Sequence, residues 1–239
     1  MFKNNKESKM ITIYEFPPAF GLTNASPFAL KLEVYCKLAN IDYQVKYRID
    51  SEKMPKKKFP VAIIDKELIA DSNIILATLE KNAKLDADLT REQHAIGYLI
   101  KELVEEKLYW CLVYSRWVDD DFWPLTKQEL FSQMPALLKL FVPNLVRKNL
   151  IKSIYAQGLG RHHKTQVYDF AIEAIEHLAS ILADKAYFVT ERMTQYDAAA
   201  YATLTNLLNG KLNTPIKTAI ENKPNIVAYI NRCHNACSV

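Results

Sequence analysis

The sequence predicts a small α/β domain followed by a larger, entirely helical domain. Four short runs with β-strand character and two helical patterns fall within residues 1–82. After a linker at residues 83–90, the apolar patterns in residues 91–239 all have the period of an α-helix. Of the 239 residues, 49% are apolar and 24% are charged, which provides for a globular core in one or two domains.

The N-terminal region is predicted to follow the order β-α-β-loop-β-β-α. Residues 1–9 are charged and are expected to be frayed. The predicted strands are Met10–Phe16, residues 41–49, residues 60–65 and residues 67–70, and the predicted helices are Pro27–Asn40 and Asp71–Lys81. The first helix has a clear start signal, because Ser26 is a favourable N-cap and Pro27 needs no backbone donor at the first helical position.

The C-terminal region is predicted to contain only helices. They are expected at Thr90–Val118, at Lys127–Leu150 with interruptions at Pro135 and Pro143, and at Thr165–Leu182, Tyr196–Leu208, Pro215–Asn222 and Asn225–Cys237. Thr194 and Asp197 have the spacing of a capping box, in which each side chain bonds the backbone N–H of the other. We therefore expect a buried helix to begin near Gln195.

Composition and charge narrow the classes of function. The net charge of +4 and the pI near 8.7 are too small for a nucleic-acid-binding protein, and modestly favour a small anionic ligand. Neither GxGxxG nor GxxxxGK[ST] occurs, which argues against a glycine-rich phosphate loop. The four cysteines form no CxxC pair, so we expect a reducing, cytoplasmic location. We expect no signal peptide and no membrane span.

Two groups of potential metal ligands lack the arrangement of a metal site. The adjacent His162 and His163 would point to different faces of a helix. Cys233 and Cys237 are four residues apart, but no third and fourth ligand is visible near them. The sequence therefore predicts no metal site.

Local motifs, in this order, resemble the cytosolic glutathione transferase superfamily. The motifs are "SPFALKLEVYCKLANI", "KKKFPVAIIDKELIADSNIILATLE" and "TQYDAAAYATL", which begin at residues 26, 56 and 194. The stretches "SPFALKLE", "YWCLVYSRWVDDDFW" and "YAQGLGRHH" more closely resemble its failed-axon-connections and metaxin-like branch. The resemblance covers Met10 to about Cys237, and implies a thioredoxin-like N-terminal domain that binds glutathione and an all-α C-terminal domain.

Ser26 is the candidate catalytic residue. A helix N-terminus and a donated hydroxyl hydrogen bond both favour a thiolate, so Ser26 is suited to lower the thiol pKa of glutathione. The alternative is an ordinary N-cap serine, with Asn24 and Tyr14 as rival donors. In the omega-like branch this position is Cys, which permits a mixed disulfide, whereas Ser favours direct attack of the thiolate on an electrophile.

The resemblance also implies which residues bind glutathione. Pro60 falls at the family's cis-proline, so that Phe59 would pair its backbone with the cysteinyl part; a trans-proline opening an edge strand is the alternative. Asp71 and Ser72 would bind the γ-glutamyl ammonium and carboxylate, or serve as N-caps. Lys58, or a neighbour in the lysine run, would meet the glycyl carboxylate, or belong to a solvated loop.

The helix predicted at Thr90–Val118 carries the candidate substrate pocket. Trp110, Tyr114, Arg116 and Trp117 follow the positions that border the hydrophobic-substrate pocket in the superfamily, and core packing is the alternative. An arginine among aromatic residues usually requires an anion. We expect the anion to be Asp119 or Asp120, or a ligand.

Two functions follow from these expectations. The first is a glutathione S-transferase that conjugates or otherwise processes a hydrophobic electrophile, with glutathione as co-substrate. The second is a non-catalytic binding or interaction module that keeps the fold. A thiol-disulfide oxidoreductase is disfavoured by Ser26. The resemblance also implies a homodimer, because transferase-type chains commonly dimerise.

Overall fold

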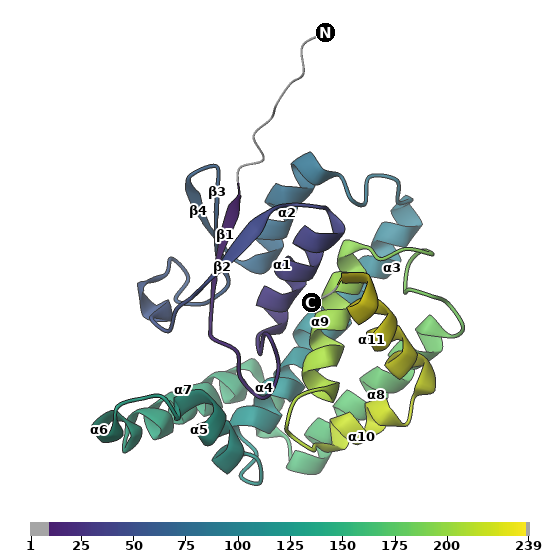
Figure 1. Ribbon diagram of the computed structural model, residues 1–239. Coiled ribbons are helices and arrows are strands. Elements are labelled where there is room, and N and C mark those ends of the chain that lie inside the picture. Colours follow the sequence, from purple (N-terminus) through teal and green to yellow (C-terminus); the bar gives the residue numbers. More distant parts are fainter. Residues whose placement is uncertain (1–9, 238–239) are drawn as a thin grey trace.

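The computed structural model describes residues 10–237 and contains a sheet domain and a helical domain (Figure 1). The first part consists of β1 (Ile11–Glu15), α1 (Pro27–Leu38), β2 (Tyr43–Tyr47), a 3-10 turn at Ser51–Lys53, β3 (Val61–Ile64), β4 (Glu67–Ala70) and α2 (Ser72–Ala83). The sheet order is β2-β1-β3-β4. β1 and β2 are parallel, whereas β3 is antiparallel to both β1 and β4.

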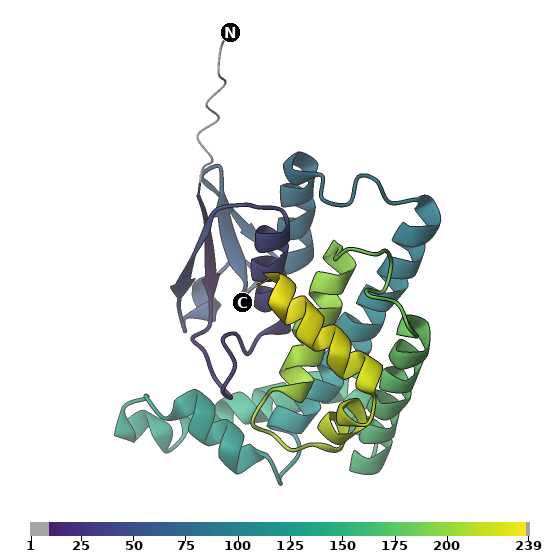
Figure 2. The same ribbon diagram turned by 45° about the vertical axis from the view of Figure 1, so that its right-hand side comes forward.

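Helices α1 and α2 cover one face of the sheet (Figures 1 and 2). A compact core joins the sheet to the two helices, with Ile13 from β1, Ala62 from β3, Leu32 from α1 and Ile75 from α2, all fully buried. The alternation of apolar residues along β1 places these side chains on the helix-covered face. This arrangement brings the start of α1 and the start of α2 to the same end of the sheet domain, near the point where β3 begins.

The second part is entirely helical among the described residues. It comprises α3 (Arg91–Glu102), a π-helical turn (Leu103–Leu108), α4 (Tyr109–Trp117), α5 (Trp123–Phe131), α6 (Ala136–Lys139), α7 (Val142–Gln157), a 3-10 turn (Leu159–Arg161), α8 (Lys164–Leu182), α9 (Gln195–Leu208), α10 (Pro215–Glu221) and α11 (Pro224–Cys237). Helix α9 is buried along almost its whole length and packs on α1, so it joins the two parts. The fold class predicted from the sequence is confirmed.

Two predicted helices differ in detail from the structure. The helix expected at Thr90–Val118 is continuous but contains the π-helical turn, which rotates α4 relative to α3. The helix expected at Lys127–Leu150 is three helices, because Pro135 precedes α6 and Pro143 lies in the first turn of α7. Proline lacks the N–H that a helix interior requires, so it is accepted at these starts.

The capping box of α9 is confirmed. The Thr194 N–H donates to Oδ2 of Asp197 at 3.0 Å, and the Asp197 N–H donates to Oγ1 of Thr194 at 3.4 Å. The other carboxylate oxygen of Asp197 accepts from the Phe188 N–H at 3.0 Å and from the Tyr229 hydroxyl at 3.2 Å. These bonds satisfy a carboxylate that is completely buried, and they fix the start of the helix that joins the two parts.

Helices α5, α6 and α7 form an arm that extends away from the helical domain in both views (Figures 1 and 2). The arm occupies residues 123–157. Within residues 10–237, no helix combines the length and the apolar composition needed to cross a bilayer.

Candidate functional site

Ser26 lies at the mouth of α1 with its side chain partly exposed. Its backbone is extended, with φ −102° and ψ 112°, and its Oγ accepts a long 3.4 Å hydrogen bond from the Ala29 N–H. Among the described residues, nothing accepts the hydroxyl proton of Ser26. The residue is therefore an N-cap, and its hydroxyl keeps a proton to donate to a ligand.

The buried side chain of Asn24 holds the backbone of Ser26. Its Oδ1 accepts from the Ser26 N–H at 2.9 Å, and its Nδ2 donates to Oε1 of Glu33 at 2.8 Å. The side chain is 1% exposed. Both ends of the amide thus bond the protein, so the structure places Asn24 beneath the loop that carries Ser26 rather than on its surface.

Two carboxyl groups lie next to the Asn24 amide. Glu15, at the end of β1, is buried, and its Oε2 has no hydrogen-bond partner among the described residues. Burial, and next the neighbouring charge of Glu33, raise the pKa of Glu15 to about 8, and a hydrogen bond from Asn24 opposes the shift. Burial also raises the pKa of Glu33. Glu15 is therefore mostly neutral at pH 7, which limits the negative potential beneath Ser26.

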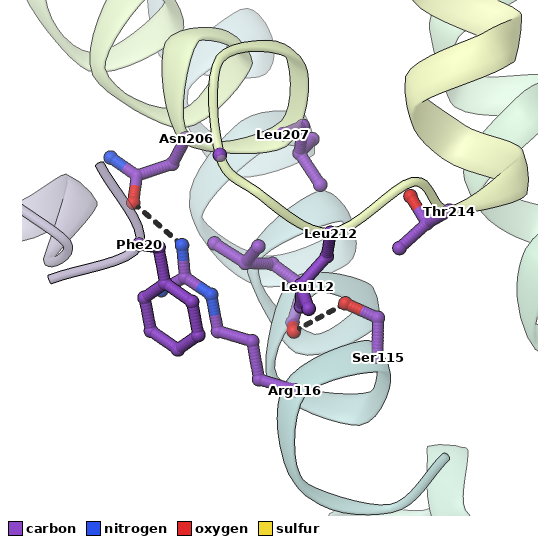
Figure 3. A pocket seen from close by; sticks show the side chains of 9 residues that line it. Phe20, Leu112, Ser115, Arg116, Asn206, Leu207, Leu212 and Thr214 are labelled. Atoms are coloured by element: carbon purple, nitrogen blue, oxygen red, sulfur yellow. Dashed lines mark hydrogen bonds between the residues drawn. The ribbon is translucent and has the colours of Figure 1, made fainter. Parts of the chain in front are cut away.

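Arg116, on α4, reaches the same loop from the helical domain. Its Nη1 donates to the carbonyl of Ala25 at 2.7 Å. Its Nη2 donates to Oδ1 of Asn206 at 2.9 Å (Figure 3). The guanidinium carbon lies 4.5 Å from the centre of the Phe20 ring. Asn206 in turn donates to the carbonyl of Asn24 at 3.2 Å. Two backbone carbonyls directly before Ser26 are thus held by side chains from α4 and α9.

The expected carboxylate partner of Arg116 was wrong. Asp119 accepts from the Lys164 ammonium at 2.9 Å and from the Tyr168 hydroxyl at 2.6 Å, while Asp120 accepts from Nη2 of Arg147 at 2.6 Å. Both acids directly follow the end of α4, and their hydrogen bonds go to these other groups. Burial lowers the pKa of Arg116 to about 10, which still leaves it protonated at pH 7. The charge of Arg116 is therefore buried next to the start of α1, and its hydrogen bonds go only to neutral acceptors.

The space beside Arg116 is too small for a substrate. Its free volume is about 10 Å³, roughly enough for one water molecule. Its lining includes Phe20, Leu112, Leu207 and Leu212, and Nε of Arg116 has no protein partner among the described residues (Figure 3). The predicted pocket residue Arg116 thus belongs to the support of the Ser26 loop.

Phe59 and Pro60 are joined by a cis peptide bond, as predicted. The Phe59 ring packs edge-on against Phe16, with ring centroids 5.0 Å apart. Within residues 10–237, no hydrogen bond to the protein uses the backbone N–H or carbonyl of Phe59. Both backbone groups therefore remain available to a ligand that lies alongside the start of β3.

Asp71 and Ser72 start α2. Oδ1 of Asp71 accepts from the N–H groups of Asn73 at 3.0 Å and Ile74 at 3.3 Å, so Asp71 is the N-cap, and its φ is 93°. Lys56 lies 3.7 Å from the other carboxylate oxygen of Asp71. Ser72 is buried at the first helical position. Lys58 is exposed and has no carboxylate partner among the described residues.

A buried ion pair near α2 was missed by the sequence reasoning. Nζ of Lys31, on α1, lies 2.5 Å from Oε1 of Glu105 in the π-helical turn, and both side chains are at most 5% exposed. Asn73 bonds both partners, accepting from Lys31 at 2.8 Å and donating to Glu105 at 3.3 Å. The sequence did offer one signal for this pair, because Lys31 and Glu105 each place a charge on the apolar face of a predicted helix.

The aromatic residues of α4 separate into two groups. Tyr114 is 7% exposed and packs on Tyr168, and Trp117 packs on Trp123 at the base of the arm. Trp110 instead contacts the ring of Tyr109. Tyr109 lies 4.6 Å, between ring centroids, from Phe28, two residues after Ser26. Phe28 and Tyr109 therefore form an aromatic surface at the first turn of α1, and neither was among the predicted pocket residues.

Comparison with known proteins identifies the family. A family model described as "Glutathione S-transferase N-terminal domain" matches residues 27–122, and one described as "Glutathione S-transferase, C-terminal domain" matches residues 171–233. The isoprene-epoxide--glutathione S-transferase of Rhodococcus sp. (strain AD45) is 30% identical over 93% of this chain and 97% of that protein. The chain belongs to the glutathione S-transferase superfamily.

Other relatives link the chain to the branch suggested by its motifs. Failed axon connections of Drosophila melanogaster is 26% identical over 98% of this chain, which spans 60% of that protein. Human metaxin-2 is 22% identical over 85% of this chain and 79% of that protein. Among solved structures, the beta-etherase LigF from Sphingobium sp. strain SYK-6 matches with a TM-score of 0.65 at 14% identity, covering 96% of this chain and 97% of that chain.

Proposed function

We propose that this protein is a glutathione transferase in which the hydroxyl of Ser26 stabilises the thiolate of glutathione for attack on a hydrophobic electrophile. The observation that carries the proposal is a partly exposed hydroxyl with a free proton at the start of α1, beside a buried and un-neutralised arginine. The positive end of the helix, the hydroxyl proton and the guanidinium charge all favour a bound anion.

Glutathione is proposed to lie across the end of the sheet domain. The backbone of Phe59 pairs with its cysteinyl part, because both backbone groups are free of protein hydrogen bonds. The start of α2, with Ser72 and Asp71, receives the γ-glutamyl carboxylate and ammonium. Lys58 attracts the glycyl carboxylate. Asn24 holds the backbone of Ser26 and is assigned a supporting role.

The electrophile is proposed to approach beside the aromatic surface formed by Phe28 and Tyr109. Trp110 extends this surface through its contact with Tyr109. A hydrophobic epoxide is a suitable class of electrophile, because the 30% identical relative is named for an isoprene epoxide. The four buried thiols of the described residues also suit a reducing, cytoplasmic location.

A calorimetric and kinetic comparison tests this proposal. Wild type and Ser26→Ala are titrated with glutathione and then assayed with a small hydrophobic epoxide, with Ser180→Ala as a control because Ser180 is an exposed serine on α8. We expect all three to bind glutathione, and only Ser26→Ala to lose about a hundredfold or more in turnover. Equal turnover in wild type and Ser26→Ala would remove Ser26 from the mechanism.

The second candidate function is a binding or interaction module without turnover. The similarity to Failed axon connections and metaxin-2 favours this alternative. It predicts that wild type shows no glutathione binding in the same calorimetric titration. That outcome would overturn the transferase proposal and direct attention to a protein partner.

A further inference from the structure

The arm formed by α5, α6 and α7 exposes an unusual density of large apolar side chains. Of the eighteen large hydrophobic residues that are exposed in the described chain, eight lie in the arm. Four of these eight lie at its tip and are more than half exposed: Leu137 is 76%, Leu140 is 73%, Leu145 is 57% and Phe141 is 56% exposed. The tip, residues 135–145, consists of the short helix α6 and the start of α7, and α6 lies farthest from the helical domain in Figures 1 and 2.

Most of the arm also carries basic residues without acidic ones. Between Glu129 and Asp169 the sequence contains no acidic residue, while the net charge of the whole chain is only +4. Within residues 10–237, Lys139, Lys148 and Lys152 have no carboxylate partner, whereas Arg147 pairs with Asp120. One unneutralised lysine, Lys139, therefore lies in the apolar tip on α6, and two more, Lys148 and Lys152, follow the tip on α7.

The exposed apolar side chains and the unpaired lysines together indicate what kind of partner the arm binds. A second copy of the same arm would bring like charges together, which disfavours a symmetric contact between arms. Exposed leucine and phenylalanine side chains next to lysines suit the interface of an anionic bilayer. The apolar side chains then lie among the acyl chains, and the ammonium groups lie at the phosphates. We propose that the arm docks the protein on anionic lipid surfaces through the tip at residues 135–145.

The docking mode requires no membrane span and no change in the fold. Leu140, Phe141 and Leu145 enter the interface, and Lys139, Lys148 and Lys152 contact lipid phosphates. The start of α5 stays attached to the helical domain, because Arg147 donates to the carbonyls of Trp117 and Val118 and lies over the ring of Trp123. The arm thus has a rigid base and an exposed tip.

Vesicle co-sedimentation of the full chain tests this inference. The vesicles are phosphatidylcholine alone, or phosphatidylcholine with one-third phosphatidylglycerol, each at low and high salt. We expect binding to the anionic vesicles that weakens with salt, and little binding to the neutral ones. Absence of binding to anionic vesicles at low salt would overturn the inference.

Two sets of substitutions separate the apolar and the charged contributions. Leu140→Ser with Phe141→Ser should weaken vesicle binding by about tenfold or more. Lys139→Glu, Lys148→Glu and Lys152→Glu together should weaken it by about a hundredfold, since each lysine near an anionic surface contributes about fivefold. The matched controls are Leu99→Ser on α3, and Lys46→Glu with Lys66→Glu and Lys81→Glu on the sheet domain. Equal losses in the controls would show non-specific attraction and overturn the inference.

A fluorescent label reports insertion directly. All four native cysteines are buried, so Leu140→Cys can be labelled selectively with an environment-sensitive dye. We expect the emission to rise and shift to the blue on anionic vesicles, and a Leu99→Cys label to remain unchanged. If sedimentation velocity instead shows an oligomer that Leu140→Ser with Phe141→Ser dissociates, the arm is a contact between copies and the inference is wrong.

Discussion

Two buried cations join the sheet domain to the helical domain, and they differ in how their charge is balanced. Lys31 reaches from α1 to Glu105, so its charge meets a carboxylate at 2.5 Å. Arg116 reaches from α4 to the carbonyl of Ala25 and to Asn206, so its charge meets only neutral acceptors. A neutralised pair adds little potential at a distance, whereas an un-neutralised charge does. The first is therefore suited to holding the domains together, and the second to stabilising an anion near Ser26.

The largest predicted effect comes from breaking the neutralised pair. Glu105→Ala leaves the buried Lys31 without its carboxylate, so we expect the free energy of unfolding in denaturant to fall by about 3–5 kcal/mol. Glu106→Ala removes the exposed neighbouring carboxylate and should change it by less than about 0.5 kcal/mol.

A double substitution sharpens this prediction. Lys31→Met combined with Glu105→Leu removes both charges, and the unfolding free energy should recover to within about 1–2 kcal/mol of wild type. If the double variant is as unstable as Glu105→Ala, the burial cost of the lysine is not the cause of the loss.

The next effect concerns the un-neutralised charge. Arg116→Met should raise the pKa of the bound glutathione thiol by about one unit, measured by thiolate absorbance, whereas Arg116→Lys should shift it less because the charge remains. Arg147→Met serves as a control, since Arg147 also bonds backbone carbonyls near the end of α4 but lies on the arm. An equal shift in the Arg147 variant would show that general loosening, not charge, is responsible.

A pH-dependent effect on stability is expected from the Glu15 carboxyl group beneath the Ser26 loop. The folded pKa of Glu15 is raised to about 8, so the folded state binds this proton more tightly than the unfolded state. Its stabilising effect is present at low pH and is lost as the pH rises from about 4.5 towards 8. Glu15→Gln should therefore flatten this decline, and raise the unfolding free energy at pH 8 above that of the wild type.

The measurement for Glu15 is urea unfolding between pH 5 and 8. Glu67→Gln, at an exposed position on β4, is the control and should follow the wild-type dependence. A Glu15→Gln variant with the same pH dependence as wild type would show that Glu15 ionises normally in the folded state.

The sequence predicted what depends on local signals. Strands, helix starts, the cis bond before Pro60 and the capping box of Thr194 and Asp197 all rest on residues close together in the chain. The contacts between the domains do not. Arg116 was expected to meet the nearby Asp119 or Asp120, or a ligand, but its protein partners lie 90 and 91 positions away.

The same reason explains the other missed features. Lys31 and Glu105 are 74 positions apart, and their meeting depends on how α1 packs against the helical domain. The π-helical turn at Leu103–Leu108 also rotates α4 relative to α3. A prediction that treats residues 90–118 as one regular helix therefore cannot assign the aromatic side chains to the side of Phe28 or to the core.

The start of α1 is proposed to ionise the glutathione thiol, and a pH titration of the bound thiol is the direct test. Ultraviolet thiolate absorbance of glutathione bound to the wild-type protein is measured from pH 5 to 10. The account predicts half-ionisation well below the value of about 9 for the free thiol, and an upward shift in Ser26→Ala. A bound thiol that titrates like free glutathione, with no change in Ser26→Ala, would contradict it.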